Sequence, residues 1–89
     1  MPADNATDYY TKPVETWTLR ELQDALGINR CAEILETTPG NIRMLRMRGA
    51  ATIERMQALQ AAVLENEQYY RNTLVTIYAT GAFRRNATT

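Results

Sequence analysis

The segment from Pro39 to Arg48 is bounded so clearly that it limits what the whole chain can fold into. Thr38 precedes it. A threonine oxygen can accept hydrogen bonds from the free N–H groups of a helix start, and proline suits the first helical position. Gly49 follows, and glycine readily adopts the left-handed conformation that ends helices. A helix is therefore predicted over residues 39–48.

A shorter helix is predicted just before it. Within residues 30–35, Cys31, Ala32 and Leu35 are small or apolar and fall on one helical face. A pair of threonines then interrupts the pattern. Two short helices joined by so tight a turn are typical of the helix-turn-helix unit, whose second helix enters the major groove of DNA.

The helix over residues 39–48 has distinct faces. At about 100° per residue, Ile42 and Leu45 point inward, and most of its other side chains point outward or to the flanks. Arginine can read guanine, methionine can contact a thymine methyl, and flanking arginines can reach phosphates. The residues predicted to read bases are Gly40, Asn41, Arg43, Met44 and Met47. The residues predicted to contact phosphates are Arg30, Thr38, Arg46 and Arg48.

An ordinary amphipathic helix, with arginines that only keep it soluble, is the alternative. The agreement of cap, turn, periodicity and outward arginines favours DNA binding over it.

The charge distribution of the chain also favours DNA binding. The 89-residue chain has no net charge, yet residues 1–42 hold three cations and seven anions, whereas residues 43–89 hold seven cations and three anions. Such asymmetry is a hint of nucleic-acid contact.

Catalytic and metal chemistry find little support in the composition. There is no histidine and a single cysteine, so no zinc finger or Cys–His site is available. Cys31 falls on the inner face of its helix and is predicted to be a small buried group. We therefore expect no enzyme activity, metal or cofactor.

One unpaired cysteine without a signal peptide favours a cytoplasmic protein of a bacterial or phage-infected cell, and no run of residues is long enough to span a membrane.

The pattern over about residues 18–49 resembles the helix-turn-helix core of the phage Cro-type and related small repressors. The matching residues are Leu19, Leu22, Leu26, Gly27, Ala32, Leu35, Thr38, Pro39, Gly40, Asn41, Ile42 and Leu45. In that family an alanine lets the two motif helices approach closely, and the resemblance implies this role for Ala32. Glu36 stands where the family usually has glycine. Because a non-glycine residue is strained in the left-handed conformation, the sequence favours a turn that is wider or differently built.

Helices are also predicted on both sides of this unit. Thr18 and Glu21 have the spacing of a capping box, which starts a helix running to Leu26. A long helical stretch follows over residues 51–78, with apolar residues three or four apart as in a coiled-coil seam. It is either continuous or broken near residues 65–67.

Composition divides the rest of the chain. Residues 1–14 are polar and include two prolines, which predicts a flexible arm, except that Tyr9 and Tyr10 would pack on the domain or a partner. Residues 15–80 are predicted to be a single domain, and residues 81–89 a flexible tail.

The second half of the long helical stretch has more apolar surface than one small domain needs, which is typical of an interface. A homodimer is predicted, and the alternative is a closed five-helix monomer. Two recognition helices held about one DNA turn apart read a two-fold symmetric operator. The residues predicted at the dimer interface are Tyr70, Leu74, Ile77 and Tyr78.

The sequence thus predicts an all-α, Cro/repressor-like helix-turn-helix domain with a C-terminal helical dimerisation region. Its expected function is sequence-specific DNA binding in transcription regulation, most simply as a dimeric repressor, as the resemblance implies. Double-stranded DNA and a second copy are the expected partners, with no membrane and no small-molecule substrate. The alternative is a protein–protein interaction module, an anti-activator or adaptor that uses the aromatic C-terminal helix.

Overall fold

Helices form where the sequence supplies start and stop residues. The computed structural model describes residues 6–79, and over this range the chain is all-helical, with five α-helices and two short 3₁₀ helices. The elements are η1 (Ala6–Tyr10), η2 (Val14–Thr16), α1 (Leu19–Leu26), α2 (Ile28–Leu35), α3 (Pro39–Arg48), α4 (Ile53–Glu65) and α5 (Glu67–Ala79). None of the helices described is long and apolar enough to cross a membrane.

The predicted helix ends are confirmed at α1 and α3. At α1, the Glu21 backbone N–H donates to the Thr18 hydroxyl at 3.2 Å, and the Thr18 N–H donates to the Glu21 carboxylate at 2.7 Å, which is the capping box. At α3, the Thr38 hydroxyl accepts from the Asn41 N–H at 3.1 Å. Gly49 ends the helix in the left-handed conformation, with φ of 76°.

The turn between α2 and α3 is tighter than the sequence indicated. Glu36 adopts the left-handed conformation, with φ 56° and ψ 49°, although it is not glycine. The Thr37 N–H donates to the Ala32 carbonyl at 2.9 Å, a bond of the Schellman type that closes the end of α2. The expectation of a wider or differently built turn was therefore wrong: the chain keeps the tight geometry and accepts strain at Glu36.

Replacing Glu36 by glycine should raise the free energy of unfolding by about 0.5–1 kcal/mol, because glycine removes a left-handed strain of about 1–2 kcal/mol but adds entropy to the unfolded chain. Chemical denaturation would measure the gain. Glu36→Ala is the matched control, since it removes the same charge but keeps the Cβ atom. Equal stability of the two variants would contradict strain at this position.

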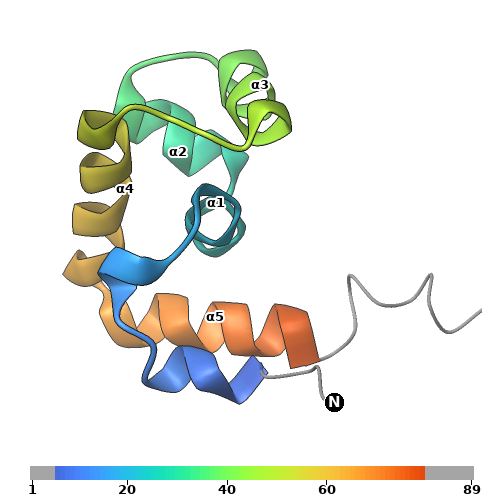
Figure 1. The fold of residues 1–89 in the computed structure, drawn as a ribbon, viewed down its shortest axis with the longest axis vertical. Helices are drawn as coiled ribbons and strands as arrows, with labels where there is room; N and C mark the ends of the chain where they lie inside the picture. The colour runs from blue at the N-terminus through green and yellow to red at the C-terminus, as the bar shows by residue number, and fades with distance from the viewer. Residues whose placement is uncertain (1–5, 80–89) are drawn as a thin grey trace, which may run out of the picture.

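The long C-terminal stretch is broken. Asn66 has φ −144° and ψ 55°, which is not helical, and it separates α4 from α5. The Asn66 carbonyl accepts from the Tyr70 N–H at 3.2 Å, the first bond of the new helix. As a result α5 turns away from the axis of α4 and passes beneath α1 (Figure 1).

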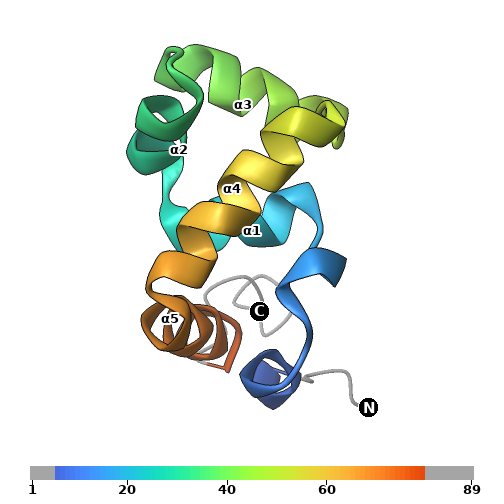
Figure 2. The same ribbon diagram turned by 90° about the vertical axis from the view of Figure 1, so that its left-hand side faces the viewer.

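The core surrounds α1, which contacts all four other α-helices. Figures 1 and 2 show it in the middle of the molecule, with α2 and α3 at one end and α5 at the other. Cys31 is fully buried in α2, as predicted, and burial raises the pKa of its thiol to about 11. The largest fully buried side chains are Trp17, Leu22, Gln23, Ile42, Leu59, Val63 and Leu74, together with Cys31.

Where the structure describes the N-terminal segment, it packs on the domain, as expected for Tyr9 but not for the rest of the predicted arm. The short helix η1 lies beside α5, as both ribbon views show (Figures 1 and 2). Tyr9 packs edge-on against Trp17, with ring centroids 5.9 Å apart, and lies 5.3 Å from the ring of Tyr78. Residues 1–5 and the predicted tail over residues 81–89 lie outside the described residues.

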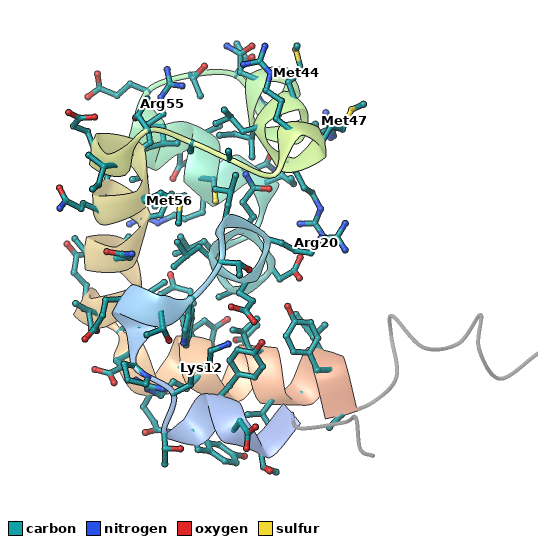
Figure 3. All side chains as sticks on the ribbon, in the orientation of Figure 1. Lys12, Arg20, Met44, Met47, Arg55 and Met56 are labelled. Carbon is teal, nitrogen blue, oxygen red and sulfur yellow. The ribbon has the colours of Figure 1, made fainter. Side chains whose placement is uncertain are left out.

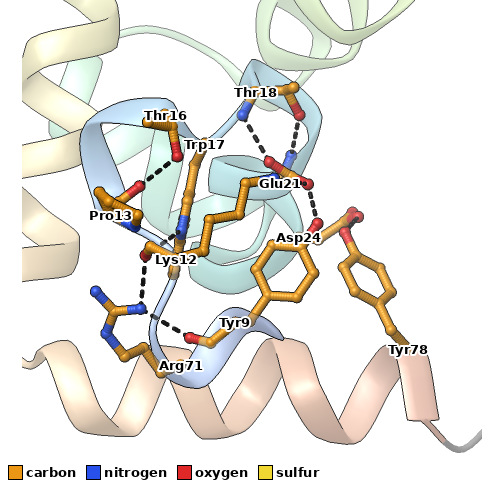
Figure 4. Close-up of polar contacts among 10 residues, drawn as sticks. All are labelled: Tyr9, Lys12, Pro13, Thr16, Trp17, Thr18, Glu21, Asp24, Arg71 and Tyr78. Atoms are coloured by element: carbon orange, nitrogen blue, oxygen red, sulfur yellow. Dashed lines mark hydrogen bonds and ion pairs between the residues drawn. The ribbon is translucent and has the colours of Figure 1, made fainter. Parts of the chain in front are cut away.

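A buried arginine on α5, Arg71, holds the N-terminal segment against that helix by hydrogen bonds. Arg71 donates to the backbone carbonyls of Tyr9 at 2.8 Å and Lys12 at 2.7 Å (Figure 4). It also donates to the Glu67 carboxylate at 2.7 Å. Its guanidinium also lies 5.7 Å from the centre of the Trp17 ring. The charge is therefore buried with its Nε and Nη1 groups hydrogen-bonded, and buried charges need such partners.

This packing buries part of the predicted dimer interface within the chain itself. Leu74 is fully buried in the chain's own core, so it offers no surface to a second copy. Tyr78 is half-buried and donates its hydroxyl to Asp24 of α1 at 2.7 Å. Tyr70 and Ile77 are also half-buried. The sequence assigned this seam to another protomer, but Leu74 packs in the core and Tyr78 bonds to Asp24 within the same chain.

Candidate nucleic-acid interface

The α3 helix has the inner and outer faces that the sequence indicated. Ile42 is completely buried and Leu45 is 8% exposed, and α3 packs on α2 and α1. On the opposite side Met44 is 51% exposed and Met47 is 86% exposed, and both project away from the domain (Figure 3). So large an exposed apolar surface on one short helix is unusual for a face that meets only water.

Two smaller residues lie near the start of α3: Gly40 on the outer face and Asn41 on one flank. A Cβ atom added at Gly40 would meet nothing closer than the Thr38 hydroxyl at 3.8 Å, so packing within the domain does not demand glycine there. Asn41 donates its side-chain N–H to the Thr37 hydroxyl at 2.7 Å. This bond holds the Asn41 amide at the flank of α3 that faces α4.

The predicted phosphate contacts fall into two groups. Arg48 is exposed and makes no ion pair within residues 6–79, and the same holds for Arg43 on the outer face. Arg30 is exposed but pairs with Glu33 of its own helix at 3.1 Å. Arg46, in contrast, is held by Asp24 of α1 at 2.8 Å.

The ion pair with Asp24 keeps Arg46 from contacting a phosphate. The Asp24 side chain is only 7% exposed, and it also accepts the hydroxyl hydrogen of Tyr78, whose ring lies beside it in Figure 4. Burial, with help from the hydrogen bond to Asp24, raises the pKa of Tyr78, so the hydroxyl stays protonated and donating. Arg46 thus fixes α3 to α1, a role that the sequence did not reveal because Asp24 lies on a different helix.

Sequence reasoning also missed Arg55. This exposed arginine lies in the first turn of α4, where Thr52 caps the helix by accepting from the Arg55 N–H at 3.3 Å. Its side chain borders a hollow between α3 and α4, and in Figure 3 it lies at the same end of the molecule as Met44. Residue spacing alone does not indicate that Arg55 borders the same hollow as residues of α3.

Within residues 6–79 no group of three or more His, Cys, Asp or Glu side chains is placed to hold a metal ion. Comparison of the chain with models of protein families, with curated proteins and with solved structures gives no match. Any functional assignment therefore depends on the geometry of α3 and its neighbours.

Proposed function

We propose that this protein binds double-stranded DNA sequence-specifically through α3, the second helix of a helix-turn-helix formed by α2, the turn at residues 36–38 and α3. The observation that carries the proposal is the outer face of α3. It presents an arginine that makes no ion pair within residues 6–79 and two exposed methionines, while its inner face is anchored in the core.

The joint between the two helices supports this assignment. Glu36 keeps the tight left-handed turn, and Ala32 of α2 is 5% exposed in the core where α2 packs against α3. A small side chain at that position allows the helices to approach closely, as the resemblance to the phage repressors implies for it. A rigid joint matters because base reading requires side chains held in register with the groove.

Five exposed residues of α3 have roles in this proposal. Arg43 donates two hydrogen bonds to guanine O6 and N7, and Met44 and Met47 contact thymine methyl groups. Gly40 leaves room for the backbone to approach the bases. Arg48 contacts a phosphate, which sets register without reading sequence. Arg46 is not included, because its ion pair with Asp24 already occupies it.

The proposed regulator acts most simply as a repressor bound to a two-fold symmetric operator. A dimer that places two α3 helices about one DNA turn apart must use a surface other than the seam of Leu74 and Tyr78 on α5. Outside α3, the large exposed apolar side chains of the described chain are Tyr10, Ile53, Leu64 and Tyr69.

The geometry favours this function over a protein–protein interaction module. That alternative depended on an aromatic stripe along the C-terminal helix, and η1 now covers part of that stripe. Tyr78 is hydrogen-bonded to Asp24 and packed against Tyr9, so it is engaged inside the domain.

The direct test is selection of bound duplexes from a random pool at physiological salt. We expect one short motif to be enriched and its retention to weaken steeply as salt rises, because phosphate contacts release counterions. The enriched duplex is then compared with a scrambled duplex of equal length. If the protein retained the two duplexes equally, or retained neither, sequence-specific binding through α3 would be refuted.

A further inference from the structure

A shallow hollow of ≈190 Å³ lies between α3 and the first turn of α4. Its lining comes from three parts of the chain: the turn before α3, one side of α3, and α4. The residues that line it are Thr37, Asn41, Met44, Leu45, Arg48 and Arg55. None of the six is acidic.

Two cationic side chains therefore border one small space without a carboxylate among the lining residues. Arg48 and Arg55 make no ion pair within residues 6–79. Like charges that share a hollow repel one another, and a bound anion would remove that repulsion. Two guanidinium groups also present several N–H donors, which suit the oxygens of a phosphate group.

The hollow offers a further donor and an apolar side. The Thr37 hydroxyl accepts from the Asn41 amide, which leaves its own hydrogen available to another acceptor. Met44 and Leu45 supply hydrocarbon to the lining, and contacts to charge are stronger where water is partly excluded. The donors thus surround a space that also has an apolar wall.

We propose that this hollow binds one phosphate group between Arg48 and Arg55, with the Thr37 hydroxyl as an additional donor. The inference rests on the proposed function, since the nearest source of such a group is a backbone phosphate of the duplex beside the groove that α3 enters. Free phosphate offers the same chemistry, and the experiment separates the two sources.

With this site, the two flanks of α3 differ in charge. On the α1 side, Asp24 neutralises Arg46, whereas on the α4 side two arginines border the hollow with no ion pair to another described residue. One DNA strand therefore meets a positive flank and the other a neutral one. Arg55 becomes part of the binding surface although it lies outside α3.

The first arm of the test uses inorganic phosphate alone on the full chain. Thermal melting in phosphate is compared with melting in chloride at equal ionic strength. Phosphate also stabilises folded proteins by exclusion from their surface, so wild type is compared with R48Q/R55Q and with R20Q, a control at an exposed arginine on α1. We expect a saturable rise in Tm in wild type and R20Q that the double variant lacks. A rise of equal size in all three would overturn the site.

The second arm measures duplex binding across salt concentrations for wild type, R48Q, R55Q and R48Q/R55Q. If both arginines hold the same phosphate, the salt slope of the double variant should fall by about one unit, as for the loss of a single contact. A fall of about two units, as the sum of two independent losses, would show two separate contacts and overturn the shared site.

The two arms also separate this inference from the proposed function. Duplex binding that is sequence-selective but unaffected by R55Q would leave the function standing and refute the site. Saturable phosphate binding without duplex retention would support the site, assign it to a free phosphate group and refute the DNA function. Single variants guard against misfolding, and the fluorescence of Trp17, the one tryptophan, reports the fold.

Discussion

Replacing Arg71 by alanine is expected to lower the free energy of unfolding by about 3 kcal/mol, among the larger effects of a single substitution. The partly buried carbonyls of Tyr9 and Lys12 would each lose a donor, and Trp17 would lose the guanidinium beside its ring. Because Arg71 fastens η1 to α5, the N-terminal segment should detach before the rest unfolds. Chemical denaturation followed by Trp17 fluorescence measures both effects.

Two other variants separate the contacts of Arg71. Arg71→Lys keeps the charge but cannot reach three acceptors with the same planar group, so it should lose part of the stability. Glu67→Gln removes only the ion pair with a half-exposed carboxylate and should cost less than about 1 kcal/mol. Equal losses from Glu67→Gln and Arg71→Ala would mean that the ion pair, and not the carbonyl contacts, fastens the segment.

Replacing Arg43 by alanine is expected to weaken binding to the selected duplex by about 1–3 kcal/mol and to relax preference at one base pair per site. Arg43 is exposed, unpaired within the described chain and on the outer face of α3, so it can reach a base edge without disturbing the core. Folding should be almost unchanged. Binding to the selected and scrambled duplexes across salt concentrations measures the difference.

Arg48→Ala is the matched comparison on the same helix. As a phosphate contact it should weaken all duplexes alike and flatten the salt slope by about one unit at most. Arg20→Ala removes an exposed arginine from α1 and should leave the preference for the selected sequence intact. Losses that are equal and independent of sequence in Arg43→Ala and Arg48→Ala would refute Arg43 as a base reader.

The ends and faces of the helices were largely predictable, because they depend on residues a few positions apart. The capping box at Thr18 and the bounds of α3 are as expected. The buried positions of Ile42 and Leu45 followed from the helical repeat alone. The turn at Glu36 was predicted incorrectly, because a rule on local strain does not include the packing of α3 on α2 that holds the turn closed.

The candidate site was predictable only in part. The outward placement of Arg43, Met44 and Met47 followed from helix geometry. The capture of Arg46 by Asp24 did not, since the two residues lie on different helices. Arg55 was missed for the same reason, because its place beside α3 depends on how α4 returns after the loop.

The sequence by itself thus determined where α1 and α3 begin and end and which side of α3 faces inward, since hydrogen bonds and side-chain spacing within a few residues decide these features. Only the tertiary structure decided what covers α5. Arg71 donates to the carbonyls of Tyr9 and Lys12, which lie 62 and 59 positions earlier in the sequence. Tyr78 donates to Asp24, which lies 54 positions earlier. No spacing rule links residues so far apart, because they meet only after the helices have packed.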